Sequence, residues 1–154
     1  MSKTVVFNLL RWLAIGIILI NLITCMDLAE SKNISSPQEI RAIVERAKNA
    51  WIDRDADALA QLFTPDAQLI VPSQRWQGQA QIREEIAKFA RQYTDVRITI
   101  HRTIVDGNQA AVEWHYEDTE TATGKRSQAD DAIVIEVKNG RISYWREYFD
   151  TSGK

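Results

Sequence analysis

Residues 96–105 read VRITIHRTIV, and residues 110–119 read AAVEWHYEDT. Apolar and polar side chains alternate in both runs, which is typical of β-strands that turn one face toward a core. Asp106-Gly107-Asn108 separates the runs and favours a tight turn. The alternation predicts an antiparallel pair of strands. The residues expected on the buried face of the first strand are Val96, Ile98, Ile100 and Ile104.

Two further strands follow toward the C-terminus. Residues 128–137 and 141–150 have strand composition, and Asn139-Gly140 between them is a hairpin signal. The second half of the chain therefore predicts four strands joined by short connections.

Helical periodicity dominates before residue 95. Ser36-Pro37-Gln38-Glu39 combines an N-cap, a proline at the first helical position and a capping box. The apolar residues that follow at helical spacing are Ile40, Val44, Ala47 and Trp51. The remaining expected elements are a helix over 56–63, a short strand over 67–71, a loop over 74–78 and a helix over 79–93. Helices followed by strands predict an α+β domain with an antiparallel sheet and a pocket between the layers.

Composition narrows the class of function. The chain has 154 residues and a formal net charge of −2, with Lys and Arg interspersed among Asp and Glu. This balance argues against a nucleic-acid partner, because such proteins usually carry a basic excess. One cysteine, Cys25, allows no internal disulfide, and with two histidines it makes a soft-ligand zinc site unexpected. No metal site and no cofactor motif is predicted.

The first thirty residues are interpreted separately from the domain. Residues 5–25 are the most apolar stretch of the chain, with Lys3 before them and Asp27 after them. An uncleaved membrane anchor, a cleaved signal peptide and a lipoprotein signal that uses Cys25 all fit this layout, and the anchor is favoured. We expect an apolar segment over 1–30, a linker over 31–36, and a domain over 37–151 on the extracytoplasmic side of a membrane, or exported.

Three segments resemble SnoaL-like proteins of the nuclear-transport-factor-2-like, or ketosteroid-isomerase-like, superfamily. They are the run from Trp51 to Ala67 (containing LFTPDA), Trp76-Gln77-Gly78 with Ile82, and the ending from Asn139 to Asp150. The resemblance implies a cone-shaped α+β fold, with three N-terminal helices on a curved, mostly antiparallel sheet, and a deep apolar pocket. It also implies a homodimer formed through the outer face of the sheet. Relatives include isomerases, cyclases, dehydratases, epoxide hydrolases and non-catalytic binding domains, so the fold does not fix the function.

Asp131 is the first candidate for a catalytic residue. It shares a strand face with Ile133, Ile135 and Val137. A carboxylate on an apolar face has a raised pKa and can act as a general base near neutral pH. The alternatives are that Asp131 is solvated at the end of its strand or is paired with an arginine.

The other candidates are a second acid or base and a set of possible ligand-binding residues. His115 is a second candidate acid or base, although strand parity favours the outer face for it. Arg146 shares a face with Tyr144 and Tyr148, and either binds an anionic ligand or forms a cross-strand ion pair. The residues that form pocket walls, or simply pack in the core, are Trp51, Trp76, Tyr93 and Trp114. Tyr148 completes the candidate ligand-binding set.

These observations predict a membrane-anchored or exported pocket domain that binds a small apolar molecule. If it is an enzyme, the expected chemistry is cofactor-free proton transfer by an isomerase, cyclase or dehydratase, with Asp131 as the base and His115 or a tyrosine assisting. The alternative is a non-catalytic module for dimerisation or protein interaction.

Overall fold

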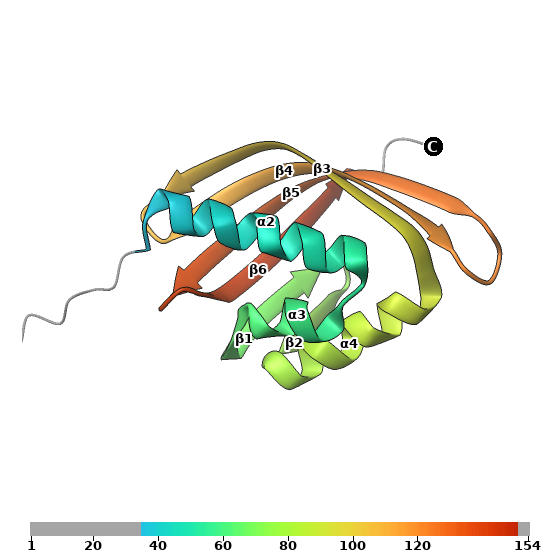
Figure 1. Ribbon diagram of the computed structural model, residues 1–154, viewed down its shortest axis with the longest axis horizontal. Coiled ribbons are helices and arrows are strands. Elements are labelled where there is room, and N and C mark those ends of the chain that lie inside the picture. The colour runs from blue at the N-terminus through green and yellow to red at the C-terminus, as the bar shows by residue number, and fades with distance from the viewer. Residues whose placement is uncertain (1–34, 151–154) are drawn as a thin grey trace, which may run out of the picture. The chain divides into compact units, whose positions relative to one another are not determined.

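The computed structural model describes residues 35–150, in which three helices and six strands form one α+β domain (Figure 1). In chain order these elements are α2 (Pro37–Asp53), α3 (Ala56–Gln61), β1 (Phe63–Val71), β2 (Gln74–Gln77), α4 (Gln79–Gln92), β3 (Tyr93–Asp106), β4 (Gln109–Glu120), β5 (Arg126–Lys138) and β6 (Arg141–Asp150). The predictions for residues 1–30, including the apolar helix, lie outside the described residues. None of the helices between residues 35 and 150 is both long and apolar enough to cross a bilayer.

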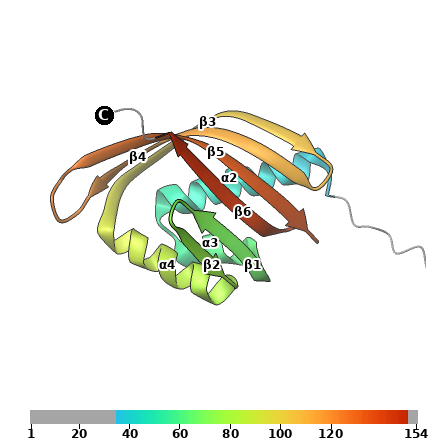
Figure 2. The ribbon, with the colours of Figure 1, turned by 180° about the vertical axis from the view of Figure 1, so that it is seen from behind.

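The strands form one curved sheet in the order β2-β1-β6-β5-β4-β3. Strands β3 to β6 are antiparallel neighbours, as predicted, and β1 pairs with β6 in parallel. Helix α2 lies along the concave face of the long strands, and Figure 2 shows the opposite, outer face of the sheet. The core therefore lies between α2 and the concave face, where Phe63, Ile133 and Trp145 are fully or almost fully buried.

The start of α2 confirms the predicted capping box. The Ser36 hydroxyl accepts a hydrogen bond from the Glu39 backbone N–H at 3.2 Å, and the Glu39 carboxylate accepts one from the Ser36 N–H at 2.7 Å. The four apolar residues predicted to share one face of this helix, from Ile40 to Trp51, are all buried. At the other end, the Arg54 guanidinium donates to the carbonyl of Tyr93 at 3.1 Å, which ties the end of α2 to the end of α4.

The segment between α3 and α4 differs from the sequence prediction. The second helix ends at Gln61 instead of Phe63, and Gln74–Gln77 is a strand where a loop was expected. Pro72 and Ser73 form a two-residue turn, with Ser73 at φ 68, that folds β2 back on β1. A side-chain hydrogen bond between Gln68 and Gln77 at 3.0 Å supports this pairing.

The position of Ile104 corrects another expectation. The register of β3 against β4 shifts between Ile100 and Arg102, and this bulge reverses which side chains face the core. Ile104 is consequently 56 % exposed instead of sharing the buried face of Val96 and Ile98.

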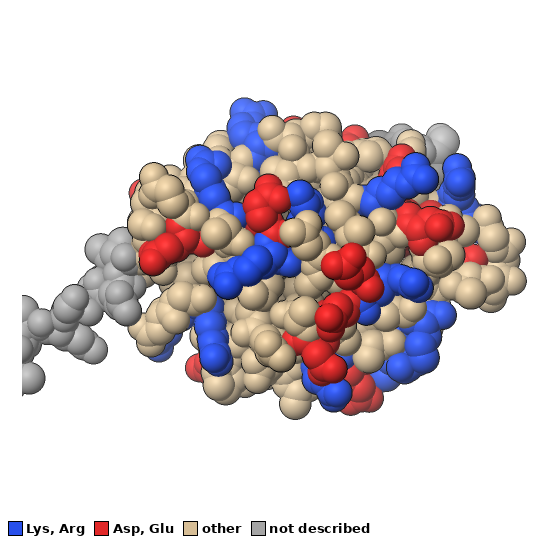
Figure 3. All heavy atoms as spheres, in the orientation of Figure 1, with Lys and Arg blue, Asp and Glu red and all other residues tan. Residues whose placement is uncertain are grey.

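Charged side chains of both signs intermix on the face that carries α2 and α4 (Figure 3). Several form ion pairs within one helix, such as Lys48 with Glu45 at 2.6 Å and Lys88 with Glu85 at 2.7 Å. Exposed pairs of this kind contribute about 0–1 kcal/mol each, so the buried core supplies most of the stability.

Candidate functional site

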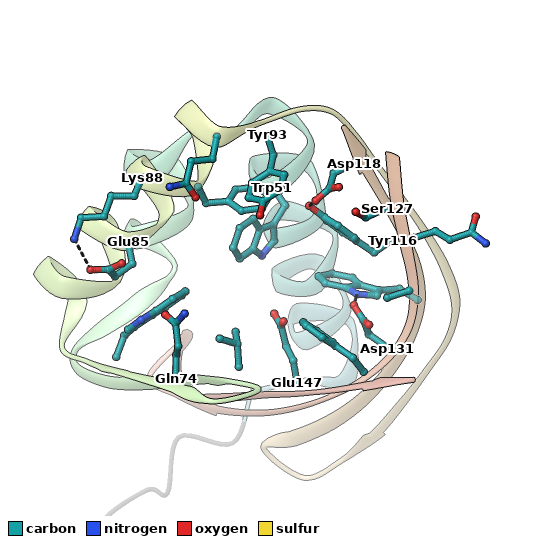
Figure 4. A pocket seen from close by; sticks show the side chains of 18 residues that line it. Trp51, Gln74, Glu85, Lys88, Tyr93, Tyr116, Asp118, Ser127, Asp131 and Glu147 are labelled. Atoms are coloured by element: carbon teal, nitrogen blue, oxygen red, sulfur yellow. Dashed lines mark hydrogen bonds and ion pairs between the residues drawn. The ribbon is translucent and has the colours of Figure 1, made fainter. Parts of the chain in front are cut away.

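A cavity of about 590 Å³ lies between α4 and the concave face of the sheet (Figure 4). Its volume falls within the range of roughly 300–1,000 Å³ that is usual for small-molecule sites. Its lining comes from α2, α4 and all six strands; the residues are Trp51, Val71, Gln74, Trp76, Glu85, Lys88, Phe89, Gln92, Tyr93, Trp114, Tyr116, Asp118, Ser127, Gln128, Ala129, Asp131, Glu147 and Phe149. The cavity thus collects residues that are far apart in the sequence.

Aromatic rings form much of the cavity wall. Trp51 meets Phe89 edge-to-face with ring centroids 5.2 Å apart, and Phe89 stacks on Tyr93 at 4.9 Å. Trp76 contributes from β2 and Trp114 from β4. The structure therefore places all four of the candidate wall residues at this cavity. Rings held against one another in this way are pre-organised to contact an apolar ligand.

Three buried carboxyl groups reach the same cavity. Asp118, Asp131 and Glu147 are only 7 %, 4 % and 9 % exposed. Each accepts a hydrogen bond from an aromatic side chain, and the strand register brings them to the inner face. Burial of acidic groups costs free energy, so a cluster of three in one cavity is a candidate functional site.

Asp131 is held by the indole of Trp114, which lies opposite it in the β4–β5 register. Trp114 Nε1 donates to Asp131 Oδ2 at 2.8 Å. Burial raises the pKa of Asp131 to about 6, and this hydrogen bond partly offsets the rise. The other oxygen, Oδ1, is buried and has no hydrogen-bond partner within residues 35–150. Asp131 is thus neither solvated nor paired with an arginine, in contrast to the two alternatives that the sequence left open.

Glu147 is a site residue that the sequence analysis missed. Trp145 Nε1 donates to its Oε1 at 2.7 Å. Burial, with a smaller contribution from the negative charge of Asp131, raises the pKa of Glu147 to about 8, and the hydrogen bond from Trp145 opposes this rise. Asp131 pairs with Phe149 and Ile133 pairs with Glu147, so the two acids are diagonal neighbours on β5 and β6. Near pH 7 Asp131 is therefore mostly ionised, whereas Glu147 retains its proton.

The third carboxyl group belongs to a Tyr116–Asp118 pair. The Tyr116 hydroxyl donates to Asp118 Oδ2 at 2.9 Å, and Oδ1 of Asp118 is buried without a partner in the described chain. Burial raises the pKa of Asp118. Burial, with the nearby charge of Asp118, also raises the pKa of Tyr116, so its hydroxyl stays protonated. Figure 4 shows this pair on the same side of the cavity as Asp131.

Three predicted site residues lie apart from the cavity. His115 is on the outer face, where Nδ1 lies 2.7 Å from Oδ1 of Asp130. Arg146 places its guanidinium over the ring of Tyr148, 4.8 Å from the centroid. The reason is the irregular register where Glu136 and Val137 meet β6, which turns Trp145 and Glu147 inward and Arg146 outward. His115, Arg146 and Tyr148 are therefore absent from the lining of the cavity.

Among the described residues, no group of three or more His, Cys, Asp or Glu side chains has the spacing of a metal site. Lys88 lines the cavity from α4. Its amino group is paired with Glu85 at 2.7 Å and Glu84 at 3.0 Å. A base with a pKa near 6 beside an acid with a pKa near 8 can accept and return a proton at neutral pH.

Solved structures share this fold at low sequence identity. A hypothetical protein with a ketosteroid isomerase-like fold from Catenulispora acidiphila, in complex with trimethylamine, has 20 % identity and a TM-score of 0.67, with 77 % of this chain and 89 % of that chain covered. An LEH-like epoxide hydrolase from M. tuberculosis has 25 % identity and a TM-score of 0.67, with 75 % and 85 % covered. TerC, co-crystallised with polyporic acid, has 19 % identity and a TM-score of 0.65, with 74 % and 93 % covered.

No curated protein gives a significant match to the sequence. Residues 44–145 match the SnoaL-like domain family. They include β4 and β5, which carry Asp118 and Asp131, and end on β6 two residues before Glu147. This segment is well over half of the chain, and its fold agrees with the solved structures. The chain therefore belongs to the SnoaL-like domain family, within the nuclear-transport-factor-2-like, ketosteroid-isomerase-like superfamily.

Proposed function

We propose that the domain binds a small organic molecule in the cavity and catalyses cofactor-free proton transfer on it. The observation that carries the proposal is the pair of buried carboxyl groups, Asp131 and Glu147, in one aromatic-walled cavity. Their environments raise the pKa of Asp131 to about 6 and that of Glu147 to about 8. Near neutral pH Asp131 can therefore act as a base and Glu147 as an acid. The ligands of structurally similar proteins, trimethylamine and polyporic acid, support a small-molecule role for the cavity.

The proposed step uses the two acids in turn. Asp131 takes a proton from a C–H bond next to a carbonyl group, and the electron pair of that bond moves to form an enolate. Glu147 donates its proton to the enolate oxygen, which leaves an enol. Return of a proton from Asp131 to a different carbon, with reprotonation of Glu147 by the enol hydroxyl, completes an isomerisation. Dehydratase or cyclase chemistry would begin with the same abstraction.

The test is deuterium exchange by the full chain in D₂O. A panel of cyclic β,γ-unsaturated ketones is incubated with the protein, and exchange and isomerisation are followed by NMR. Asp131→Asn should lower the rate at least 100-fold, which is the usual size of a general-base contribution. Asp130→Asn is the matched control, because Asp130 is the neighbouring acid on the outer face and should leave the rate unchanged. Equal rates for wild type and Asp131→Asn would refute the proposal.

We further propose that residues 5–25 hold the domain at a membrane, on its extracytoplasmic side. The support is the apolar run itself, with Lys3 and Arg11 toward its start and Asp27 after it. Intact-mass measurement of the chain from the membrane and soluble fractions of its host distinguishes an anchor, a cleaved signal and a lipoprotein. A full-length mass supports the anchor, loss of the segment supports a cleaved signal, and a lipid adduct on Cys25 supports a lipoprotein.

A second candidate function is dimerisation through the outer face of the sheet. A shallow hollow of about 500 Å³ on this face is lined by Ile104, Ala111, Ala132 and Tyr148, among others, and Ile104 and Tyr148 are largely exposed. Exposed apolar residues gathered in one place often mark an interface. Sedimentation should show a dimer for wild type and a monomer for Ile104→Lys. Thr99→Lys, an exposed change elsewhere on β3, is the control, and a monomeric wild type would exclude the homodimer.

A further inference from the structure

The cavity has an unbalanced charge. Asp118, Asp131 and Glu147 bring three carboxyl groups, of which Glu147 is neutral and Asp131 ionised near pH 7, whereas the one cationic side chain among the described lining residues is Lys88. Lys88 is already paired with Glu84 and Glu85 at 3.0 and 2.7 Å. Figure 4 shows it on α4, across the cavity from Asp131. The acids on the sheet side therefore have no cation of this domain beside them in the cavity, so an anionic ligand would meet repulsion there.

Two carboxyl oxygens of residues that line the cavity lack a hydrogen-bond donor. Oδ1 of Asp118 and Oδ1 of Asp131 are buried, and neither receives a hydrogen bond from residues 35–150. The second oxygen of each group is already used by Tyr116 or Trp114. An unpaired buried acceptor costs about 1–3 kcal/mol, and more when it is charged. A ligand with an N–H group could satisfy one of these oxygens after a small movement of the side chains that cover it.

The aromatic wall adds a preference for positive charge. The cavity is lined by the indoles of Trp51, Trp76 and Trp114 and by the phenols of Tyr93 and Tyr116. The faces of indole and phenol rings attract cations, and the attraction grows when the cation is removed from water. A cavity that combines such rings with buried carboxylates suits an organic cation better than a neutral molecule of the same shape.

We propose that the ligand of this cavity is a protonated organic amine with at least one N–H group and an apolar body. The ammonium group would donate to the free oxygen of Asp131 or of Asp118, and the apolar body would lie against the aromatic wall. This inference rests on the proposed small-molecule function of the cavity and names the chemical class of its ligand. It adds an ammonium group to the small apolar molecule that the family resemblance suggested.

Four probes of nearly equal shape test the inference. They are N,N-dimethylbenzylammonium, its neutral isostere isobutylbenzene, benzyltrimethylammonium, which has the charge but no N–H, and the anion phenylacetate. Binding to the full chain is followed by tryptophan fluorescence at pH 7, because three indoles line the cavity. We expect N,N-dimethylbenzylammonium to bind at least tenfold more tightly than isobutylbenzene and benzyltrimethylammonium, with phenylacetate weakest.

Variants locate the binding site. Asp131→Asn should weaken N,N-dimethylbenzylammonium binding at least tenfold, and Asp130→Asn, its outer-face neighbour, should stay within twofold of wild type. Circular dichroism verifies that both variants are folded. If Asp131→Asn fails to fold, proton release supplies the test on wild type. Since a bound cation lowers the pKa of the carboxyl groups, calorimetry in two buffers of different ionisation enthalpy should show proton release on binding at pH 7.

Four results would overturn the inference. Equal or tighter binding of isobutylbenzene, an unchanged affinity in folded Asp131→Asn, absence of proton release, or no binding of any probe would each reject a protonated amine. None of these results touches the deuterium-exchange test, which uses neutral ketones. Conversely, ketone exchange that persists in Asp131→Asn would reject the proton-transfer function while amine binding remained measurable.

Discussion

Trp114 and Asp131 face each other across β4 and β5, and the indole N–H donates to Oδ2 over 2.8 Å. The same indole packs against Trp145, with ring centroids 5.7 Å apart, and Trp145 donates in turn to Glu147. Two core tryptophans thus fix the two acids that we propose as base and acid. Packing of the core and orientation of the site depend on the same side chains.

Trp114→Phe should perturb Asp131 more than the fold. The substitution keeps an aromatic ring but removes the donor, and the loss of that hydrogen bond raises the pKa of Asp131 above its wild-type value of about 6. Leaving a buried carboxyl group unpaired should lower the free energy of unfolding by about 1–3 kcal/mol. NMR titration of the Asp131 carboxyl carbon and urea denaturation measure the two effects. Trp76→Phe, at the same cavity, is the control, and a lower pKa of Asp131 in Trp114→Phe would contradict the expectation.

Stability should fall as pH rises from about 4 to about 8. Asp131 and Glu147 have native pKa values of about 6 and about 8, above their ordinary values near 4. The unfolded chain therefore releases these protons at lower pH than the folded chain does, and the native state loses stability through this window. Glu147→Gln keeps an acceptor for Trp145 but cannot ionise. This variant should show a smaller decrease of the free energy of unfolding with pH. At pH 8 it should be more stable than wild type by about 3–5 kcal/mol.

Urea denaturation at several pH values measures this slope. Glu136→Gln is the matched control, because Glu136 is exposed on the neighbouring strand and bonds Gln109 through an oxygen that the amide retains. An equal slope in wild type and Glu147→Gln would show that Glu147 does not hold its proton in the folded protein.

His115 should titrate as part of a surface pair with Asp130. The hydrogen bond that His115 donates to Asp130 raises the pKa of His115, with smaller contributions from the charges of Asp130 and Glu117. The stabilising effect of this pair is present below the ordinary histidine pKa of about 6.5 and is lost as pH rises through the raised value. Asp130→Asn should lower the pKa of His115 in an NMR titration.

The sequence predicted those parts of the fold that depend on local chemistry. The capping box at Ser36 and Glu39 and the alternation in β4 and β5 require only neighbouring residues, and both were confirmed. Strand β2 was missed because its sequence, QRWQ, has no apolar alternation. Its pairing depends instead on the turn at Pro72 and on contact with β1.

The site was harder to predict because two bulges reset the strand parity. If inward and outward side chains alternated regularly from Ile142, Arg146 would face the core. The register shift beside Val137 turns Glu147 toward the core instead. The shift in β3 turns Ile104 outward in the same way. Asp131 lies on β5, whose pairing with β4 is regular, and its inward position followed from parity alone. One extra residue in β6 therefore decides whether Arg146 or Glu147 faces the cavity.

Gly78 should tolerate substitution poorly. It precedes α4 with φ 84 and ψ 148, a conformation that only glycine adopts easily, and an added Cβ would lie 3.3 Å from the Pro65 carbonyl oxygen. Gly78→Ala should lower the free energy of unfolding by about 1–3 kcal/mol. Gly107→Ala is the matched control: Gly107 also has a positive φ, but nothing lies within 4 Å of an added Cβ. A loss in Gly78→Ala no larger than that in Gly107→Ala would contradict the steric argument.

The pH dependence of turnover should be bell-shaped if Asp131 and Glu147 act as base and acid. Activity requires an ionised Asp131, so the rate should rise through about pH 6, and it requires a protonated Glu147, so the rate should fall through about pH 8. Glu147→Gln should remove the alkaline limb and lower the maximum, because the amide has no acidic proton to give. Trp114→Phe should move the acid limb upward, since the hydrogen bond that it loses lowers the pKa of Asp131. The rate of deuterium exchange into a ketone, measured in D₂O at several pH values, gives this profile. The apparent pKa values are corrected for the solvent isotope effect. A rate that climbs steadily from pH 5 to pH 9 would leave Glu147 without a role as acid.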